Sequence, residues 1–469
     1  MFRSRRSFNS YYGKRRQNRR FSNLWILLSI PVFLLLLELL TRTLVALIGQ
    51  SSELATYQGE PSEVTAYRLK FLNEQLQPYD GLSPRGNLVA QRNPIVGYQL
   101  APQQNHQFWQ INAQGFRDSE PVPLKKPQDE IRIFILGGST AFGQGTQSNQ
   151  ATIASQLETR LNERIAQQKR SPQKYQPDFI PFYLPERIKA LALPPKIRAG
   201  KYRIINAAVP GYTSGNQLAQ LTLQILPYKP DLIIVLNGYG DLMLPSTETA
   251  TEIPHLEEFL NDAPGHFATY LGKSVQNFVK NTYLVKAVEY WVLKPEPTLA
   301  QRSLVFSNST TPLTTYLPAN EEEMQLRLER YRNHHLQMVR ICAGAGIPLV
   351  ITLQPEITSL LERNSDGEQK IIEALEPDYL QTIQASYPQL SKVNQKLAQT
   401  FPKNVKNVDF YKSLAQLLTE DGNFTKGEKV FTDAIHLTDE VNRVIANQLY
   451  QTVTTLPKIQ VIPENSGLK

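Results

Sequence analysis

The chain has 469 residues, of which 41% are hydrophobic and 20% charged, so it is long and apolar enough for a large core and is not intrinsically disordered. A net charge of +8 suggests nucleic acid binding, but residues 1–23 hold eight Lys or Arg and no acidic residue. Subtracting these eight from the 50 basic residues leaves 42, which equals the number of acidic residues. The basicity belongs to one tail, and we expect no nucleic acid partner.

Residues 24–49 form an apolar segment that is long enough to cross a bilayer as a helix, which takes about 20 residues. Glu38 and Arg42 interrupt it, and their spacing of four places them on one helix face where they can pair. The basic residues before this segment predict a cytoplasmic tail at 1–23, a transmembrane signal anchor at 24–49 and an extracytoplasmic remainder. A cleaved signal peptide is the alternative, but no clear small-x-small site follows the segment.

Cysteine usage excludes two kinds of stabilisation. Cys342 is the only cysteine, so no internal disulfide can form. The chain has no CxxC or CxxH pattern of the kind that binds structural zinc. We therefore expect no metal site and no cofactor.

Strands and helices alternate along the chain after a polar segment at 50–128, which we interpret as a juxtamembrane stalk and lead-in. Each predicted strand is a continuous apolar run, which indicates a parallel sheet covered by helices on both faces. The predicted strands are 131–136, 202–206, 232–236, 348–353 and 405–410, and the predicted helices are 151–168, 214–226, 321–343 and 438–453.

This pattern predicts an α/β domain formed by 129–241 and 321–457, with a C-terminal tail at 458–469. Residues 242–320 break the alternation and are interpreted as an inserted cap or lid, with an amphipathic helix at 281–295. In parallel sheets, ligands bind beyond the carboxyl ends of the strands. The glycine-rich turns at 137, 211 and 238 follow such ends and should converge.

Ser139 is the first candidate for chemistry, because the strand 131–136 ends in Gly137-Gly138-Ser139-Thr140. A glycine-rich turn after a strand also suits phosphate binding. However, the turn has no Lys that would complete a GxxxxGK[ST] loop, and it lacks a GxGxxG pattern. A nucleophilic serine displayed at the carboxyl end of a strand is the interpretation that remains.

A serine nucleophile needs a base, and only six histidines are available. His436 follows Asp433 by three residues and precedes the last predicted helix, so the carboxylate can orient the imidazole. The other histidines lie in the lead-in, in the insertion, or mid-helix at His334 and His335, which we assign to a solvated face.

At these residues the chain resembles the SGNH (GDSL-type) hydrolase superfamily in its membrane-anchored bacterial form. The motif LGGST matches the first block with Ser139 as nucleophile, AAVPGYTSG matches the second with Gly211 as oxyanion donor, and D-x-x-H matches Asp433 and His436. The resemblance implies a flavodoxin-like three-layer α/β/α sandwich with a mostly parallel five-stranded sheet. It also implies a serine esterase or acylhydrolase. INAQGFRD at 111–118 and QPE at 354–356 also resemble the family, without a role that the sequence reveals.

One block departs from the family pattern. The third block is normally G-x-N-D, but the sequence reads Gly238-Tyr239-Gly240-Asp241, so the Asn that donates to the oxyanion is absent. Losing one such donor typically costs about 100- to 1000-fold in rate. The side chain of Asn237 or the backbone N–H of Gly240 can substitute, and Asn216 is a more distant candidate. We expect Asp241 to cap the segment that follows.

Two functions stay open. The first is an exported, membrane-anchored esterase that acts on carbohydrate or lipid esters, with water or a sugar hydroxyl as acyl acceptor. The second is a weak or inactive member that binds envelope polysaccharide or a protein partner. The missing Asn favours the second, and the intact Ser139, His436 and Asp433 favour the first.

Overall fold

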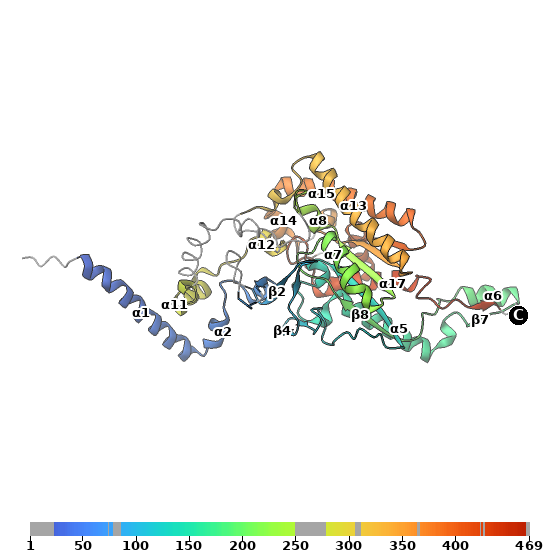
Figure 1. The fold of residues 1–469 in the computed structure, drawn as a ribbon, viewed down its shortest axis with the longest axis horizontal. Coiled ribbons are helices and arrows are strands. Elements are labelled where there is room, and N and C mark those ends of the chain that lie inside the picture. The colour runs from blue at the N-terminus through green and yellow to red at the C-terminus, as the bar shows by residue number, and fades with distance from the viewer. Residues whose placement is uncertain are drawn as a thin grey trace, which may run out of the picture. The chain divides into compact units, whose positions relative to one another are not determined.

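The computed structural model describes residues 23–73, 75–77, 86–248, 278–304, 311–363, 366–422, 424 and 427–465 (Figure 1). The predicted cytoplasmic tail lies outside these residues except for Asn23, and so does much of the predicted insertion. The chain forms two compact units, which we describe separately. The first comprises Met1–Gly59 and Ser274–Pro295, and the second comprises Glu60–Lys273 and Glu296–Lys469.

The second unit is built on a sheet of five parallel strands in the order β11-β10-β9-β6-β8. Every residue of β9 is buried, as expected for a strand covered on both faces. The sheet confirms the predicted α/β class. Its strands are β6 (Glu130–Gly137), β8 (Lys201–Asn206), β9 (Leu232–Asn237), β10 (Leu349–Leu353) and β11 (Val405–Asp409).

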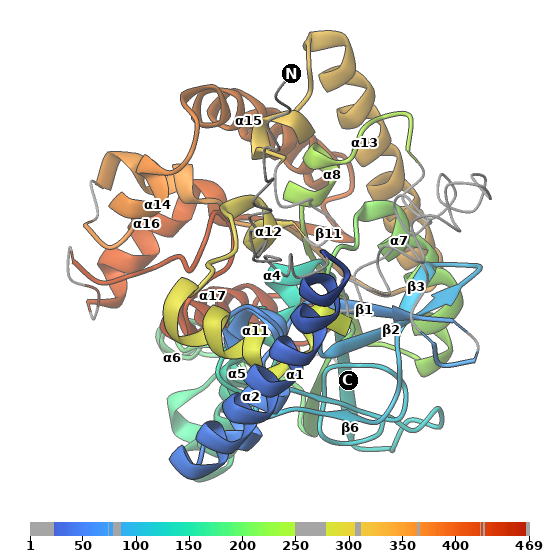
Figure 2. The ribbon, with the colours of Figure 1, turned by 90° about the vertical axis from the view of Figure 1, so that its left-hand side faces the viewer.

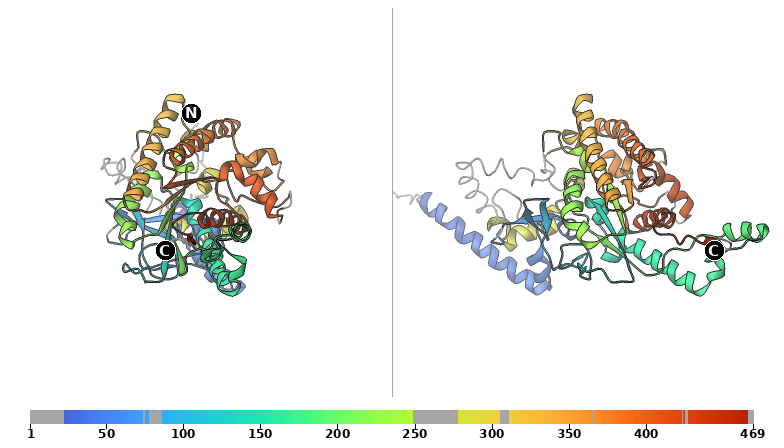
Figure 3. Two further views of the ribbon diagram at one scale, coloured as in Figure 1. Left: turned by 90° about the vertical axis from the view of Figure 1, so that its right-hand side faces the viewer. Right: turned by 45° about the vertical axis from the view of Figure 1, so that its right-hand side comes forward.

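Helices cover both faces of this sheet and make three layers (Figure 3). Successive side chains of a strand point to opposite faces, so Ile133 and Ile135 join one hydrophobic core while Phe134 and Leu136 join the other. The first core is covered by α5 (Ile153–Arg170), α16 (Phe410–Asp421) and α17 (Asp439–Thr454). Helix α7 (Ser214–Gln220) packs on the second core, while α13 (Glu321–Gly344) and α15 (Pro377–Thr400) contribute to both.

Residues 60–128, within the segment interpreted as a juxtamembrane stalk and lead-in, belong to the second unit. Strands β1 (Leu69–Leu72), β2 (Leu88–Asn93) and β3 (Gly97–Leu100) make a small mixed sheet whose buried side chains join the first core. The phenol of Tyr98 donates to the carbonyl of Pro210 at 2.8 Å. These short strands alternate buried and partly exposed residues, and this half-polar pattern is what made the segment look like a stalk.

The described part of the predicted C-terminal tail also packs against the second unit. Ile459 is fully buried, and β12 (Glu464–Asn465) pairs with β7 (Phe179–Ile180) in the Pro-rich segment that follows α5. The shorter elements of this unit are α3 (Ser62–Thr65), β4 (Gln104–Asn105), β5 (Gln110–Ile111), α4 (Ser139–Phe142), η1 (Asn149–Ala151), η2 (Pro172–Lys174), α6 (Leu184–Leu191), η3 (Leu221–Ile225), η4 (Leu226–Tyr228), α8 (Tyr239–Met243), α12 (Leu299–Ser303), η6 (Leu313–Tyr316), η7 (Ile357–Arg363) and α14 (Gln369–Glu373).

The first unit contains α1 (Asn23–Ile48), α2 (Ser51–Thr56), α11 (Tyr283–Ala287) and η5 (Val288–Leu293). Within α1, the 20 residues Ser29–Ile48 are long and apolar enough to cross a membrane. The helix predicted at 281–295 is present as α11 and η5, and it lies beside α1 (Figure 2). The predicted insertion is therefore divided, because α11 and η5 belong to this unit whereas α12 and η6 belong to the other.

Candidate active site

Ser139 is the first residue of α4, directly after β6 and the Gly137-Gly138 pair. Gly137 has no room for a side chain, because a Cβ there would lie 2.3 Å from the carbonyl oxygen of Leu236 on the neighbouring strand. This close approach lets the chain turn at once from strand to helix. The N–H of Ser139 belongs to the first turn of α4, where the helix itself offers no acceptor.

Arg117, in the INAQGFRD segment, holds the other end of α4. Its buried guanidinium donates to the carbonyls of Phe142 at 2.9 Å and Gly143 at 2.7 Å, which are the carbonyls that a helix C-terminus leaves unpaired. A cation is also favoured there by the helix dipole. Burial lowers the pKa of Arg117. This contact gives the segment a role that the sequence did not reveal: it fixes the helix that carries Ser139.

Asp433 and His436 form a buried pair in the loop before α17. The Nδ1 atom of His436 lies 2.6 Å from Oδ2 of Asp433, while Oδ1 of Asp433 accepts the backbone N–H groups of Ile435 and His436. Burial alone would raise the pKa of Asp433, but His436 and these N–H groups outweigh it and lower that pKa. The Nε2 atom of His436 is buried and has no hydrogen-bond partner within the described residues.

Hydrogen bonds join this loop to the serine turn. The hydroxyl of Thr140, next to Ser139, donates to the carbonyl of Ile435 at 3.3 Å. Gln354 donates its side-chain amide to the same hydroxyl at 3.1 Å. The N–H of Ile357 donates to the carbonyl of Ala434 at 2.9 Å. Residues 354–357, which include the QPE motif, therefore connect the two segments.

Glu356 of the same motif is fully buried and does not face a basic side chain among its described partners. It accepts hydrogen bonds from the hydroxyl of Tyr379 at 3.0 Å and from the N–H and hydroxyl of Thr358. Burial raises the pKa of Glu356 to about 7, although these hydrogen bonds oppose the shift. The carboxyl group therefore changes its charge near neutral pH, one residue from the hydrogen bond between Ile357 and Ala434.

The three glycine-rich turns converge as predicted. A Cβ at Gly138 would lie 3.0 Å from the carbonyl oxygen of Tyr212, and a Cβ at Gly240 would lie 3.6 Å from the same oxygen. Among the described residues, no hydrogen bond takes up the N–H of Gly211. The N–H of Gly240 belongs to the first turn of α8 and has no acceptor within that helix. These groups and the N–H of Ser139 are the candidate oxyanion donors.

Asn237 was predicted as a further oxyanion donor, and the structure corrects this. Both hydrogens of its amide are engaged, one with Oε1 of Gln217 at 2.6 Å and the other with Nε2 of His335 at 3.2 Å. Its carbonyl oxygen accepts from the hydroxyl of Tyr331. This buried network links β9 to α7 and α13 and leaves Asn237 no hydrogen for a substrate. Asn216 forms a capping box with Thr213 and donates to the carbonyl of Val96.

Asp241 also differs from its prediction. Its carboxylate accepts the N–H and the hydroxyl of Ser214, so it caps α7 and not the segment that follows it. The Nδ1 atom of His334 lies 2.8 Å from the Ser214 hydroxyl, and His335 is fully buried. Burial lowers the pKa of both histidines, that of His335 to about 4. The assignment of both to a solvated face is therefore wrong, because this face of α13 packs on α7 and β9.

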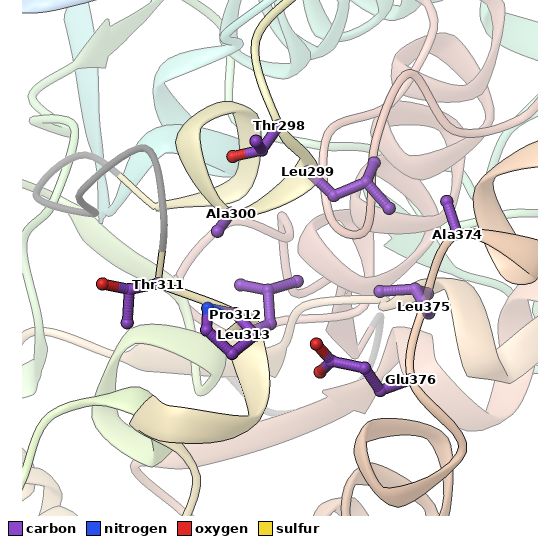
Figure 4. A pocket seen from close by; sticks show the side chains of 9 residues that line it. All are labelled: Thr298, Leu299, Ala300, Thr311, Pro312, Leu313, Ala374, Leu375 and Glu376. Carbon is purple, nitrogen blue, oxygen red and sulfur yellow. The ribbon is translucent and has the colours of Figure 1, made fainter.

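Part of the predicted insertion touches the loop that carries Asp433 and His436. The hydroxyl of Ser303, at the end of α12, accepts the N–H of Ala434 at 3.3 Å, and Gln144 donates to the carbonyl of Arg302. The start of α12 lines a cavity of about 180 Å³ together with residues 311–313 and 374–376 (Figure 4). The polar groups that line it are Thr298, Thr311 and Glu376.

Metal ligands are not gathered in any part of the chain that the structure describes: no three His, Cys, Asp or Glu side chains there could hold an ion. Cys342 is buried, and burial raises the pKa of its thiol to about 12.

The second unit places the serine turn after β6 and the D-x-x-H loop before α17, at one five-stranded parallel sheet with helices on both faces. No protein-family model and no curated protein matches the chain. The structure is similar to that of an acetyl xylan esterase, with 13% identity, coverage of 69% of this chain and 100% of that chain, and a TM-score of 0.32. A lipase/acylhydrolase from Enterococcus faecalis has 11% identity, coverage of 69% and 95%, and a TM-score of 0.32. A two-domain esterase active on acetylated mannans has 10% identity, coverage of 70% and 51%, and a TM-score of 0.31. Similarity at this level carries no argument about the function of this chain.

Proposed function

We propose that the chain is a membrane-anchored, extracytoplasmic serine esterase that acts on carbohydrate or lipid esters. The observation that carries the proposal is the Nε2 atom of His436, which is buried and has no hydrogen-bond partner among the residues that the structure describes, while Asp433 fixes the opposite ring nitrogen at 2.6 Å. A buried polar atom without a partner costs about 1–3 kcal/mol. A base that must receive the proton of Ser139 accounts for such an atom, whereas a binding protein has no use for it.

In this mechanism Ser139 attacks the acyl carbonyl, and His436 takes the hydroxyl proton and later returns it to the leaving alcohol. Asp433 holds the imidazole in the tautomer that leaves Nε2 free to accept, and it stabilises the imidazolium that forms. The N–H groups of Ser139, Gly211 and Gly240 stabilise the oxyanion. Water then releases the acyl group by hydrolysis, while a sugar hydroxyl in the same position would give O-acyl transfer.

The membrane anchor is α1, supported by its apolar composition and by the basic residues that precede it. The positive-inside rule then gives a cytoplasmic N-terminus and an extracytoplasmic active site. An exported and tethered esterase has envelope carbohydrate and lipid esters within reach. The α12 segment beside the catalytic loop is the part of the insertion that we expect to select among them.

Labelling of the full-length protein with a fluorophosphonate tests the proposal, because the reagent reacts with activated serines only. We expect labelling of the wild type and none of Ser139→Ala or His436→Ala. Ser214→Ala is the matched control, since Ser214 also lies between a His and an Asp but is completely buried, and it should keep its labelling. A folded wild type that labels no more than Ser139→Ala would refute the esterase and favour the binding protein.

A further inference from the structure

Glu38 is the most unusual residue of α1, because it places a carboxylate among apolar side chains ten residues before the helix ends. A carboxylate within the apolar part of a bilayer is costly, so such residues are normally paired. The Nε atom of Arg42 donates to Glu38 at 2.8 Å. One arginine leaves most of the acceptor capacity of the carboxylate unused.

The remaining partners of Glu38 come from the predicted insertion. The backbone N–H of Tyr283 donates to one carboxylate oxygen at 2.9 Å, and that of Leu284 donates to the other at 2.9 Å. The guanidinium of Arg42 lies over the ring of Tyr283, 4.7 Å from its centre. The first N–H groups of a helix have no acceptor within it, so α11 and Glu38 satisfy each other.

Two polar side chains of α11 and η5 bond to α2, which follows α1 in the chain. Lys286 donates to the carbonyl of Ala55 at 2.7 Å, and the hydroxyl of Tyr290 donates to Glu53 at 2.5 Å. Val45, Leu54 and Ala287 form a small hydrophobic cluster between the helices. Contacts therefore hold this segment along the second half of α1 and along α2.

The side chains that do not face α1 and α2 are large, apolar and exposed. Val292 is 73% exposed and Leu293 65%, and Phe278 is 76% exposed. Val279, Val288 and Trp291 are also exposed. Soluble proteins rarely leave a contiguous patch of this kind in water. The exposed apolar residues of α1 include Leu44, Leu47 and Ile48, and α11 contacts the same helix.

We propose that residues 278–293 insert into the outer face of the bilayer beside α1, so that lipid acyl chains cover their exposed apolar side chains. This inference rests on the proposed membrane anchor. Glu38 is then the docking point of a second membrane contact, and the segment is too short to span. Tyr283, Tyr290 and Trp291 suit the membrane interface, where aromatic side chains with a polar end are enriched.

The test uses the full-length chain in nanodiscs of phosphatidylcholine and phosphatidylglycerol, with an environment-sensitive dye on a single introduced cysteine. Cys342 is buried and its thiol pKa is raised, so the wild type gives the labelling background. The dye is placed at Val292→Cys, with Leu36→Cys on α1 reporting on the anchor. Leu326→Cys on α13 is the control for an exposed apolar residue in the other unit. Doxyl-labelled phosphatidylcholine quenches dyes that contact lipid.

We expect doxyl lipid to quench the dyes at Val292 and Leu36 to a similar degree and to leave the dye at Leu326 unchanged. Adding Glu38→Leu should reduce the quenching at Val292 and not at Leu36, because the acceptor for α11 is lost. Quenching at Leu36 without quenching at Val292 would overturn the inference, because lipid would then not contact the side chain at 292. The proposed anchor would stand. No quenching at Leu36 would refute the anchor and the inference together.

Discussion

Replacement of Asp433 by Asn tests the proposed triad most directly, because the change keeps the shape of the side chain and alters one hydrogen bond. The Asn oxygen can still accept the N–H groups of Ile435 and His436, which bond Oδ1 of Asp433 at 2.9 and 3.0 Å. The Asn amide then faces Nδ1 of His436, where the carboxylate oxygen lies at 2.6 Å. An amide donates there, so Nδ1 must accept and the ring proton must move to Nε2.

An imidazole that is protonated at Nε2 cannot take the proton of Ser139. A substitution of this kind lowers kcat by about 10⁴-fold in serine hydrolases, which corresponds to about 5.5 kcal/mol in the activation barrier. We expect this loss in kcat with KM nearly unchanged, measured as hydrolysis of p-nitrophenyl acetate by the full-length protein in detergent. The free energy of unfolding should change by less than about 2 kcal/mol.

Asp378→Asn, on the exposed first turn of α15, is the control and should keep wild-type kcat. If Asp433→Asn kept more than about a tenth of the wild-type kcat, the ring of His436 would not depend on Asp433 for its tautomer. The assignment of His436 as the base would then fail.

Three further predictions follow from the contacts around the site. Arg117→Met should lower the free energy of unfolding by about 3–6 kcal/mol, because the carbonyls of Phe142 and Gly143 each lose a charged donor that contributes about 1.5–3 kcal/mol. Chemical denaturation measures this loss. A loss below about 1 kcal/mol would show that water replaces the guanidinium. Gly240→Asn should raise kcat by up to about 100-fold, because the amide restores the oxyanion donor of the third block. The side chain has room, since a Cβ at Gly240 would meet only ordinary contacts at 3.5 and 3.6 Å. An unchanged kcat in a folded variant would mean that the oxyanion does not lie near this turn. Glu356→Gln should change how stability depends on pH. The pKa of Glu356 is raised from 4.5 to about 7, so the folded state holds a proton that the unfolded state has lost, and its contribution to stability falls by about 3 kcal/mol as pH rises through this range. The pKa of His335 is lowered from 6.5 to about 4, so its contribution rises between these values and opposes that of Glu356. Between pH 4.5 and 6.5 the free energy of unfolding of Glu356→Gln should therefore rise relative to that of the wild type, and parallel profiles would contradict the assignment.

The amino-acid sequence by itself determined the elements whose cause is local. The strands β6, β9 and β10 are largely apolar runs, and the long helices α5, α13 and α17 follow a stripe of apolar residues. The serine turn could be predicted because a strand, two glycines and a hydroxyl stand together. The pairing of Asp433 with His436 could be predicted because the two residues are three apart and meet within one loop.

Tertiary structure decided everything that depends on residues distant in the sequence. The amide of Asn237 is taken up by Gln217 and His335, which lie 20 and 98 residues away, so its sequence position beside the third block was misleading. His335 was assigned to solvent because its neighbours on α13 are polar, yet its face of the helix packs on β9 and α7. The carboxylate of Asp241 accepts hydrogen bonds from Ser214, 27 residues earlier, and the sequence gives no sign of this contact.

The segment 60–128 and the residues 242–320 show what composition alone does not reveal about a region. Short strands such as β1 and β2 present polar residues on one face and bury the other, so only their partners reveal that they belong to a core. The apolar residues of α11 and η5 have the pattern of an amphipathic helix, but the pattern does not say which surface they cover. That answer came from Glu38, 245 residues before Tyr283, because a carboxylate within an apolar helix requires donors that only the folded chain supplies.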